Sequence, residues 1–332
     1  MEVIFSQGVY LPELDLWLDS RRRKEAGLIS HAHADHTARH YHPILTPNTQ
    51  LLLSEYLKKS SPIVLEYREP LETEKYTLTL YPAGHCLGSA QTLVESKITG
   101  ERLLYTGDFK SRPSPVNEPL EPVSCDVLVI EATYGRSEYV FPAEEQVLST
   151  AFNTLRHWLS KGERPVVQGW RLGKAQEVLH YLLAEGFDVA VEESAYRIAE
   201  VYEQAGVKFP GRFHLFNRHW PEGQVIICPP GRRSAALLGS FRGKRFMGLT
   251  GWSVNGGHGW GWGRRGDASL PYSDHADFND LVGYVRQVQP SQVYTVNGFP
   301  ELAAHLRQLG YPAVHLDGNG PPQYGGFQMR LL

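Results

Sequence analysis

The stretch that decides the fold is SHAHADH, residues 30–36, which follows the apolar segment GLI. It places His31, His33, Asp35 and His36 in the pattern HxHxDH. Side chains two positions apart point to the same side of an extended chain, so the first two histidines can bind one metal ion together. Asp35 and His36 lie beyond the turn and can face a second ion. Imidazole and carboxylate groups form a zinc-type ligand set that also suits manganese, whereas the alternative is a histidine-rich surface turn.

Two further segments place polar side chains beside glycine at the end of an expected strand. PAGHCLGSA, residues 82–90, carries His85, and YTGDF, residues 105–109, carries Asp108. Taken singly, each residue fits an ordinary turn, because turn chemistry alone favours such neighbours. In this order after HxHxDH, they are better explained as additional metal ligands.

Composition sets outer limits on the function. The chain has 332 residues, of which 42% are hydrophobic and 21% charged, as in ordinary globular proteins. No apolar run approaches the roughly 18 residues of a membrane span, and the N-terminus does not resemble a signal peptide. The three cysteines lie far apart without a CxxC pair, which argues against a disulfide framework and favours a reducing, cytoplasmic location. The net charge of −3 does not by itself attract nucleic acid.

The texture of the sequence changes along the chain. The first 140 residues indicate short strands and turns, with one strand over 3–11 and one helix over 50–60. Helices are expected over 143–161, 172–186 and 194–206, alternating with strands, which predicts a parallel sheet. Further helices are expected over 277–288 and 301–310 around the strand QVYTV. Three segments follow as predicted domain parts: 1–141, 142–267 and 268–332.

Two later motifs point to a known family. EATYG at 131–135 and SDHAD at 273–277, added to HxHxDH, the histidine in a glycine-rich turn and TGD, resemble the β-CASP branch of the metallo-β-lactamase fold. Members of that branch process nucleic acids. The combined motifs most resemble bacterial DNA-ligase-associated exonucleases, some of which are described as mRNA 3′-end-processing factors. The resemblance implies an α/β chain, a four-layer αββα sandwich with an inserted α/β β-CASP domain.

The resemblance also implies a role for each motif residue. His31, His33 and His85 would bind the first metal, Asp35 and His36 the second, and Asp108 would bridge both. Two such metals can clamp a phosphodiester and activate water, and Asp35 can also accept a proton from that water.

Three acidic or histidine residues complete the set of catalytic candidates. Asp19, in LWLD, matches an acidic residue that orients a ligand, and Glu131 matches an acidic residue of the branch. His275 matches a histidine near the scissile phosphate, where it can act as general acid with Glu131 orienting it. Without the resemblance, SDHADFNDL would be interpreted only as the start of a helix.

One position departs from the family pattern. The strand QVYTV is followed by Asn297 and Gly298, where the branch usually has a histidine that completes the second metal site. A neutral amide oxygen is a poorer zinc ligand than imidazole, so the sequence predicts a weak ligand. One or two zinc ions are therefore expected, with manganese an option at the second position.

Basic and aromatic residues crowd the region before SDHAD and are candidates for phosphate contact and base stacking. They are Arg232, Arg233, Arg242, Lys244, Arg245, Arg264, Arg265, Trp252, Trp260 and Trp262. The alternative is a solvated loop with structural tryptophans. The run Arg21–Lys24 fits a solvated turn, and Gly173 with Lys174 fits helix packing better than phosphate binding.

These features predict a metal-dependent phosphodiester hydrolase, and the resemblance implies that it is a 5′-to-3′ DNA exonuclease in DNA repair. The alternatives are an RNA-processing nuclease of the same branch, a nucleic-acid-binding member weakened by Asn297, and a small-molecule metallo-hydrolase. DNA is the expected partner and RNA the second choice, with no membrane partner. A functional association with a DNA ligase or helicase follows only from the resemblance.

Overall fold

A computed structural model describes residues 1–217, 219–254 and 267–316, and the chain divides into two compact units. Unit 1 comprises Met1–Ser137 and the described residues from His275 onward, and unit 2 comprises Glu138–Asp274. The predicted insert, 142–267, falls inside the sequence range of unit 2, and its exact domain boundaries stay predictions. No helix among the described residues is long and apolar enough to cross a membrane.

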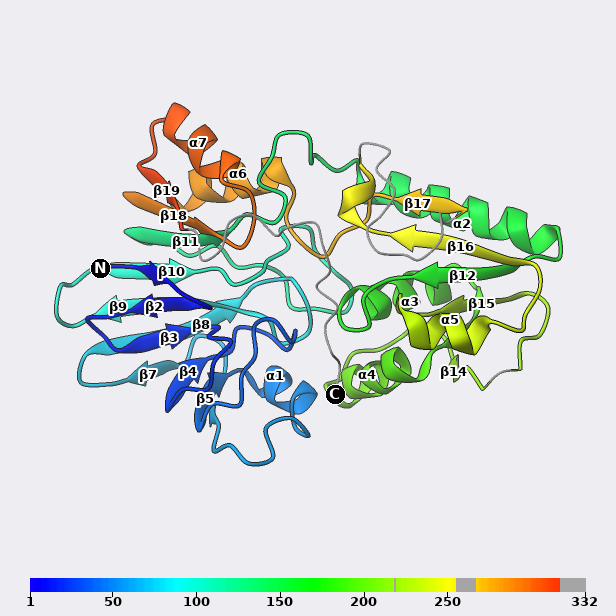
Figure 1. Ribbon diagram of the computed structural model, residues 1–332, viewed down its shortest axis with the longest axis horizontal. Helices are drawn as coiled ribbons and strands as arrows, with labels where there is room; N and C mark the ends of the chain where they lie inside the picture. The colour runs from blue at the N-terminus through cyan, green and yellow to red at the C-terminus, as the bar shows by residue number, and fades with distance from the viewer. Residues whose placement is uncertain (218, 255–266, 317–332) are drawn as a thin grey trace. The chain divides into compact units, whose positions relative to one another are not determined.

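The first sheet of unit 1 is built from the N-terminal 64 residues, and its six strands follow one another in chain order (Figure 1). They are β1 (Ile4–Phe5), β2 (Val9–Leu11), β3 (Leu16–Leu18), β4 (Ala26–Leu28), β5 (His42–Leu45) and β6 (Ile63–Val64). The first three strands are antiparallel and the pairings from β3 to β6 are parallel. Helix α1 (Pro47–Leu52) follows β5.

The second sheet of unit 1 joins both ends of the chain, in the order β19-β18-β11-β10-β9-β8-β7. Its strands are β7 (Pro70–Glu72), β8 (Tyr76–Pro82), β9 (Ala90–Ser96), β10 (Arg102–Tyr105), β11 (Val127–Glu131), β18 (Gln292–Val296) and β19 (Ala313–His315). Since β10, β11 and β18 are parallel and β9 runs against both β8 and β10, the carboxyl ends of β8, β10, β11 and β18 share one edge.

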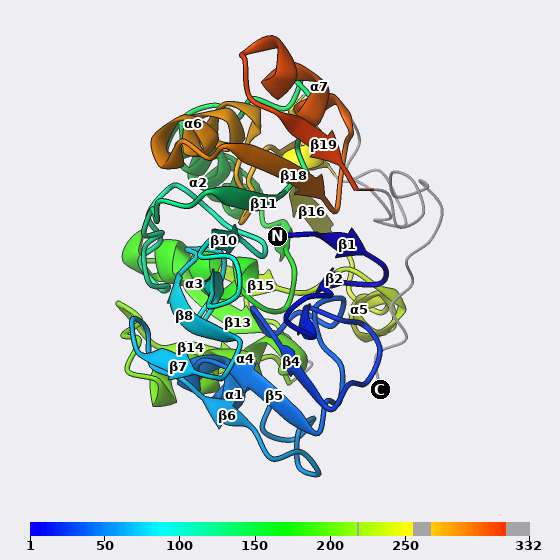
Figure 2. The ribbon, with the colours of Figure 1, turned by 90° about the vertical axis from the view of Figure 1, so that its left-hand side faces the viewer.

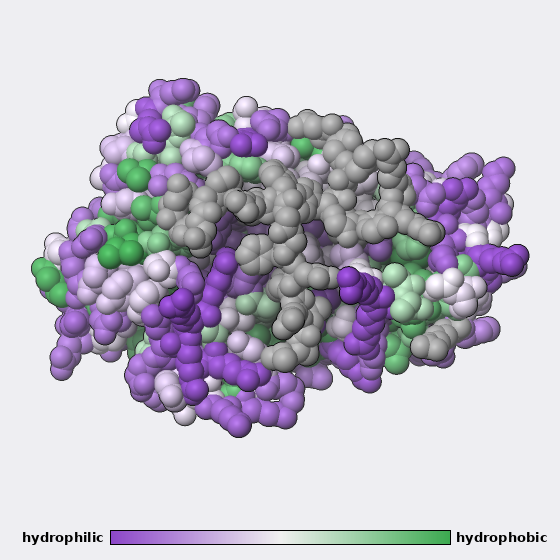
Figure 3. Space-filling model, viewed as in Figure 1, coloured by the Kyte–Doolittle hydropathy of each residue, from purple (hydrophilic) through white to green (hydrophobic). Residues whose placement is uncertain are grey.

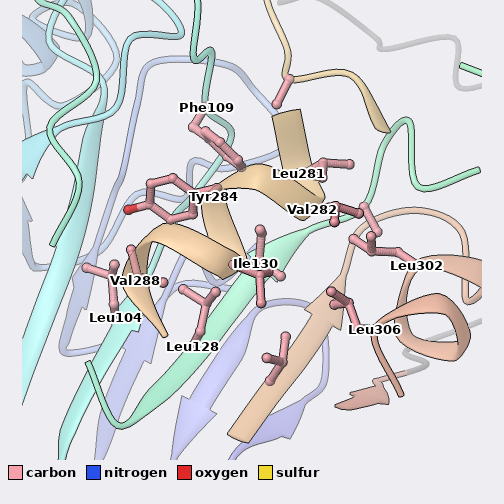
Figure 4. Close-up of a cluster of buried hydrophobic side chains, with 14 of the residues drawn as sticks. Leu104, Phe109, Leu128, Ile130, Leu281, Val282, Tyr284, Val288, Leu302 and Leu306 are labelled. Carbon is pink, nitrogen blue, oxygen red and sulfur yellow. The ribbon is translucent and has the colours of Figure 1, made fainter. Parts of the chain in front are cut away.

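Alternation along the strands of the second sheet separates the two larger hydrophobic cores of unit 1. Leu103 and Val129 point toward the first sheet and pack with Leu18 and Leu28, whereas Leu104, Leu128 and Ile130 point the other way. The second core is closed by α6 (Phe278–Val288) and α7 (Glu301–Gln308), whose apolar faces meet those strand residues (Figure 4). Figure 2 shows both helices on the side of β11 and β18 away from β1 and β2. The α/β class and the metallo-β-lactamase type of layering predicted from the sequence are confirmed.

Unit 2 is a parallel α/β domain, as the alternating pattern predicts. Its sheet order is β14-β13-β15-β12-β16-β17, and every pairing is parallel. The strands are β12 (Arg164–Gln168), β13 (Asp188–Val191), β14 (Phe213–Leu215), β15 (Gln224–Ile227), β16 (Lys244–Leu249) and β17 (Ala268–Leu270). The helical segments are α2 (Glu144–Ser160), α3 (Lys174–Ala184), α4 (Glu193–Gln204), α5 (Arg232–Leu238) and the 3₁₀ turn η1 (Gly251–Ser253).

Two predicted elements of unit 1 are wrong in detail. Residues 3–11 form a hairpin of β1 and β2, because Gln7 at φ 57° and Gly8 at φ 133° turn the chain between them. The helix expected over 50–60 ends at Leu52 and begins earlier, at Pro47. Thr46 caps it by accepting a hydrogen bond from the Thr49 amide, and proline suits the first helical position.

Candidate metal centre

Four predicted ligands converge at the shared edge of the second sheet. His31 and His33 follow β4, His85 follows β8, and Asp108 follows β10. Their ligand atoms all lie within 4.8 Å of one another. His33 Nδ1 lies 3.1 Å from His31 Nε2 and 3.0 Å from His85 Nε2, and His31 Nε2 lies 3.7 Å from Asp108 Oδ2.

The chemistry of this cluster fits a zinc ion. His31 and His85 are fully buried, and a packed core ordinarily separates imidazole nitrogens rather than aiming them at one point. Burial, reinforced by the neighbouring His36 and His85, holds the pKa of His31 well below its usual range, so its ring is neutral. Neutral imidazoles with a carboxylate are the ligand set that zinc prefers, and this chain would hold the ion with these four side chains.

Asp108 reaches this edge because of a glycine beside it. Gly107 has φ 56°, and a Cβ there would lie 2.8 Å from Ser30 Oγ, so only glycine lets the two loops approach so closely. Burial raises the pKa of Asp108, but His36, His275 and His31 outweigh it and hold that pKa well below its usual range. The carboxylate is therefore ionised and can act as a ligand.

Asp19 organises the next layer of contacts. Its Oδ2 accepts hydrogen bonds from Ser30 Oγ at 2.6 Å and Tyr105 Oη at 2.9 Å, and lies 2.8 Å from His36 Nδ1. The Ser30 amide donates to Oδ1 at 2.7 Å. With Nδ1 turned to Asp19, His36 presents Nε2 to Asp108 Oδ2 at 3.2 Å. Such outer contacts fix the tautomer of a ligating histidine, which is the role predicted for Asp19.

The predicted second metal site is less complete. The Asp35 side chain is 47% exposed, and its Oδ2 lies 3.9 Å from His36 Nε2. Among the described residues, Asp35 belongs to no cluster of three metal-binding groups. Asn297 follows β18 with φ 55° and is half-buried. Its part as a weak ligand stays a prediction.

Glu131 and His275 form a pair beside the cluster. His275 Nδ1 lies 3.1 Å from both carboxylate oxygens of Glu131, which also accepts the Phe109 amide at 2.9 Å. The His275 and His85 rings lie 4.6 Å apart between centroids. The helix-start interpretation of this segment is also right, because Asp277 caps α6 through a capping box with Asp280. One turn thus starts the helix and presents the histidine.

Two supporting residues escaped the sequence analysis. Tyr105 and Ser30 hold Asp19, and the contact from Tyr105 spans 86 positions in the chain. Ser30 directly precedes the first ligand, which is a local signal, whereas nothing near Tyr105 in the sequence indicates its partner.

The predicted nucleic-acid residues of unit 2 are largely occupied by contacts within the unit. Arg233 pairs with Glu193 at 2.6 Å, and Arg245 pairs with Glu163 at 2.6 Å and Asp267 at 2.8 Å. Lys244 donates to backbone carbonyl groups at the end of α5. These contacts leave less of each cation for phosphate, and a nucleic-acid role for these residues stays a prediction.

The remaining nucleic-acid candidates of unit 2 include residues that the structure describes and residues that it does not. Arg232 and Arg242 are exposed, and Trp252 packs edge-on against Tyr139 at 5.1 Å. Trp260, Trp262, Arg264 and Arg265 lie outside the described residues. Lys174 is buried in unit 2 and pairs with Asp274 at 3.1 Å, which agrees with the packing role expected for it.

Comparison with known proteins also points to a zinc-dependent hydrolase. Residues 268–316 match the family model described as the Zn-dependent metallo-hydrolase RNA specificity domain. The chain is 37% identical over 318 residues to a probable DNA ligase of Opitutus terrae, covering 94% of this chain and 31% of that protein. It is 25% identical over 350 residues to the 5′ exonuclease Apollo of Gallus gallus, covering 95% of this chain and 69% of that protein.

A third relative is an RNase J-like protein of Methanocaldococcus jannaschii, 29% identical over 182 residues, covering 47% of this chain and 42% of that protein. The fold, the cluster and these relatives together define a metallo-hydrolase of the metallo-β-lactamase type. Within that class, the chain belongs to the β-CASP family. It spans about a third of the length of the Opitutus protein, 31%.

Proposed function

We propose that the chain is a metal-dependent nuclease that removes nucleotides from the 5′ end of DNA during repair. The observation that carries the proposal is the convergence of His31, His33, His85 and Asp108 beside the Glu131–His275 pair. The likeness to a protein named 5′ exonuclease, over 95% of this chain, supports the polarity. The likeness to a protein named probable DNA ligase supports DNA as substrate.

Each side chain of the site would have a different role in phosphodiester hydrolysis. When bound, metal supplies Lewis-acid activation of a phosphoryl oxygen and of the attacking water. Asp35, at 47% exposure, is accessible enough to accept a proton from that water. His275 has Nδ1 facing Glu131, so its Nε2 is the atom that can donate a proton to the leaving oxygen. Glu131 acts on the reaction by positioning that ring.

An RNA-processing nuclease is the second candidate. The matched family model is described by RNA specificity, and it covers both His275 and Asn297. Two other interpretations of the sequence become outcomes of the same test: a member that binds nucleic acid without cleaving it, and a hydrolase of small molecules.

The test is a cleavage assay on end-labelled single- and double-stranded DNA and RNA, with and without a 5′-phosphate, in zinc and then in manganese. Asp108→Asn serves as the inactive variant, and Glu74→Gln, which removes an exposed acid, as the matched control. Mononucleotide release from 5′-phosphorylated DNA by wild type and control only is the expected result. Cleavage of RNA alone would select the second candidate, and binding without cleavage in either metal would reject both.

Association with a DNA ligase is part of the proposal. The chain covers 31% of a protein named probable DNA ligase. If that protein combines a nuclease part with a ligase part, the two activities would act on the same DNA ends. Pull-down of the tagged chain with a ligase or helicase from its own cells tests this, and fractionation of those cells tests the predicted cytoplasmic location.

A further inference from the structure

Five basic residues of unit 1 lie outside the metal cluster and take no part in the mechanism above. Four of them, Arg21, Arg22, Arg23 and Lys24, connect β3 to β4, and the fifth, Arg39, precedes β5. We refer to these five as the basic strip. The arginines are exposed and Lys24 is half-buried. Figure 3 shows hydrophilic residues gathered over the part of unit 1 where Figure 1 draws β3, β4 and β5.

The basic strip lacks ion-pair partners among the described residues. Within the described part of the chain, no carboxylate forms an ion pair with any of its five members. Several other arginines of this chain do have such partners, including Arg156 with Glu185 and Arg197 with Glu200. Burial lowers the pKa of Lys24 most and the neighbouring Arg22 lowers it further, whereas Asp15 partly offsets them. An anionic partner would relieve the repulsion between Arg22 and Lys24.

The basic strip is tied to the metal-binding loop. Arg21 Nε donates to the backbone oxygen of Asp35 at 3.1 Å, inside the HxHxDH segment. Arg21 also lies two positions after Asp19, which contacts His36. The Arg21 end of the basic strip therefore lies next to the metal-binding residues that would act on a phosphodiester.

Aromatic rings lie between the cations. Lys24 Nζ lies 3.3 Å from the ring centroid of Trp17, and Arg23 Cζ lies 3.7 Å from that of Tyr41. Trp17 stacks on Tyr10 across the β2–β3 pair, at 4.3 Å between centroids. Tyr41 is 47% exposed. Cations that follow a phosphate backbone, alternating with flat rings on which bases stack, are what proteins use to bind single strands.

We infer that the basic strip binds a single nucleic-acid strand leading away from the metal cluster, with cations on its phosphates and Tyr41 against its bases. This inference rests on the proposed nuclease function and adds to it the path of the strand. It favours a nucleic acid over an acidic protein because the aromatic rings would have no special role against carboxylates.

The test measures binding of a phosphorothioate-linked, cleavage-resistant DNA single strand to the full zinc-loaded chain by fluorescence anisotropy. Arg22→Ser with Arg23→Ser should weaken binding about tenfold and reduce the slope of log Kd against log salt by about 1.4, since each lost phosphate contact on a single strand accounts for about 0.7. The matched control, Lys75→Ser with Arg286→Ser, removes two exposed charges of unit 1 and should change neither.

A second variant keeps the charges and removes a ring. Tyr41→Ser should weaken DNA binding about fivefold while leaving the affinity for inorganic polyphosphate unchanged, because only bases stack. Equal binding by the Arg22/Arg23 variant and its control would overturn the inference, and so would polyglutamate binding as tight as DNA. Hydrolysis of a small phosphodiester by the wild type is measured in parallel. Its absence would count against the proposed function, whereas the strip is judged by binding alone.

Discussion

The predicted metal centre has an inner half, the ligands of the first metal, and an outer half, the ligands of the second. The two halves differ in how many of their ligands the structure brings together. In the inner half, His31, His33, His85 and Asp108 bring four ligand atoms within 4.8 Å, and two of the rings are fully buried. In the outer half, His36 is well supported, but Asp35 is 47% exposed and Asn297 stands where a histidine is expected. Ligands held by packing need little rearrangement to bind an ion, so the inner half should bind metal more tightly than the outer half.

Removing the carboxylate of Asp108, which belongs to the inner half and also contacts His36 of the outer half, should have the largest effect. Asp108→Asn loses a charged ligand while keeping its shape, and metal activation amounts to several kcal/mol, so hydrolysis should fall by about a thousandfold or more. Zinc content measured by mass spectrometry should fall with it. If the Asp108→Asn variant kept both its zinc and its activity, Asp108 would not be a ligand of the inner half.

His275→Ala should separate proton transfer from metal binding. Because a positioned general acid contributes about a hundredfold to ten-thousandfold, kcat should fall in that range while zinc content stays constant. Glu131→Gln should reproduce part of the loss, since it weakens the contact with His275 Nδ1. Loss of zinc from the His275 variant would instead make this histidine a ligand.

Asp19→Asn tests whether the outer half depends on its supporting contacts. The substitution weakens the contact to His36, and such changes reduce metal affinity or activity by about 10- to 100-fold. Asp15→Asn, an exposed acid near the same strands, is the matched control and should have no effect. Competition with a zinc chelator gives the affinity, and equal values for both variants would remove Asp19 from the site.

Asn297→His should have the smallest effect and the opposite sign. Histidine tolerates the left-handed φ of 55° at this position and supplies the missing imidazole. Zinc content should rise from about one ion to two, with an increase in kcat of about tenfold. The number of zinc ions bound per chain, measured after dialysis for the wild type and for Asn297→His, tests this prediction. A chain that already holds two ions as wild type would show that the outer half is complete without the histidine.

Local patterns in the sequence determined much of this protein. HxHxDH, the histidine and aspartate beside glycines, and the strand–helix alternation of unit 2 each depend on neighbours a few positions apart. Such spacing fixes which side chains share a face, so the parallel sheet could be predicted and the residues of the His31, His33, His85 and Asp108 cluster could be named as candidate metal ligands.

Only the tertiary structure decided which distant groups meet. The Tyr105 contact to Asp19 spans 86 positions, and no local pattern encodes a pairing of that length. The pairing of His275 with Glu131, across 144 positions, is implied by the family resemblance and not by any local pattern. The same holds for charge: sequence shows a run of arginines but not whether acids elsewhere neutralise them. Arg233 and Arg245 form ion pairs with carboxylates of their unit, whereas Arg21–Lys24 form no ion pair among the described residues. Whether an arginine forms an ion pair depends on its distance in space from a carboxylate and not on their separation along the chain. Only the folded structure shows that distance.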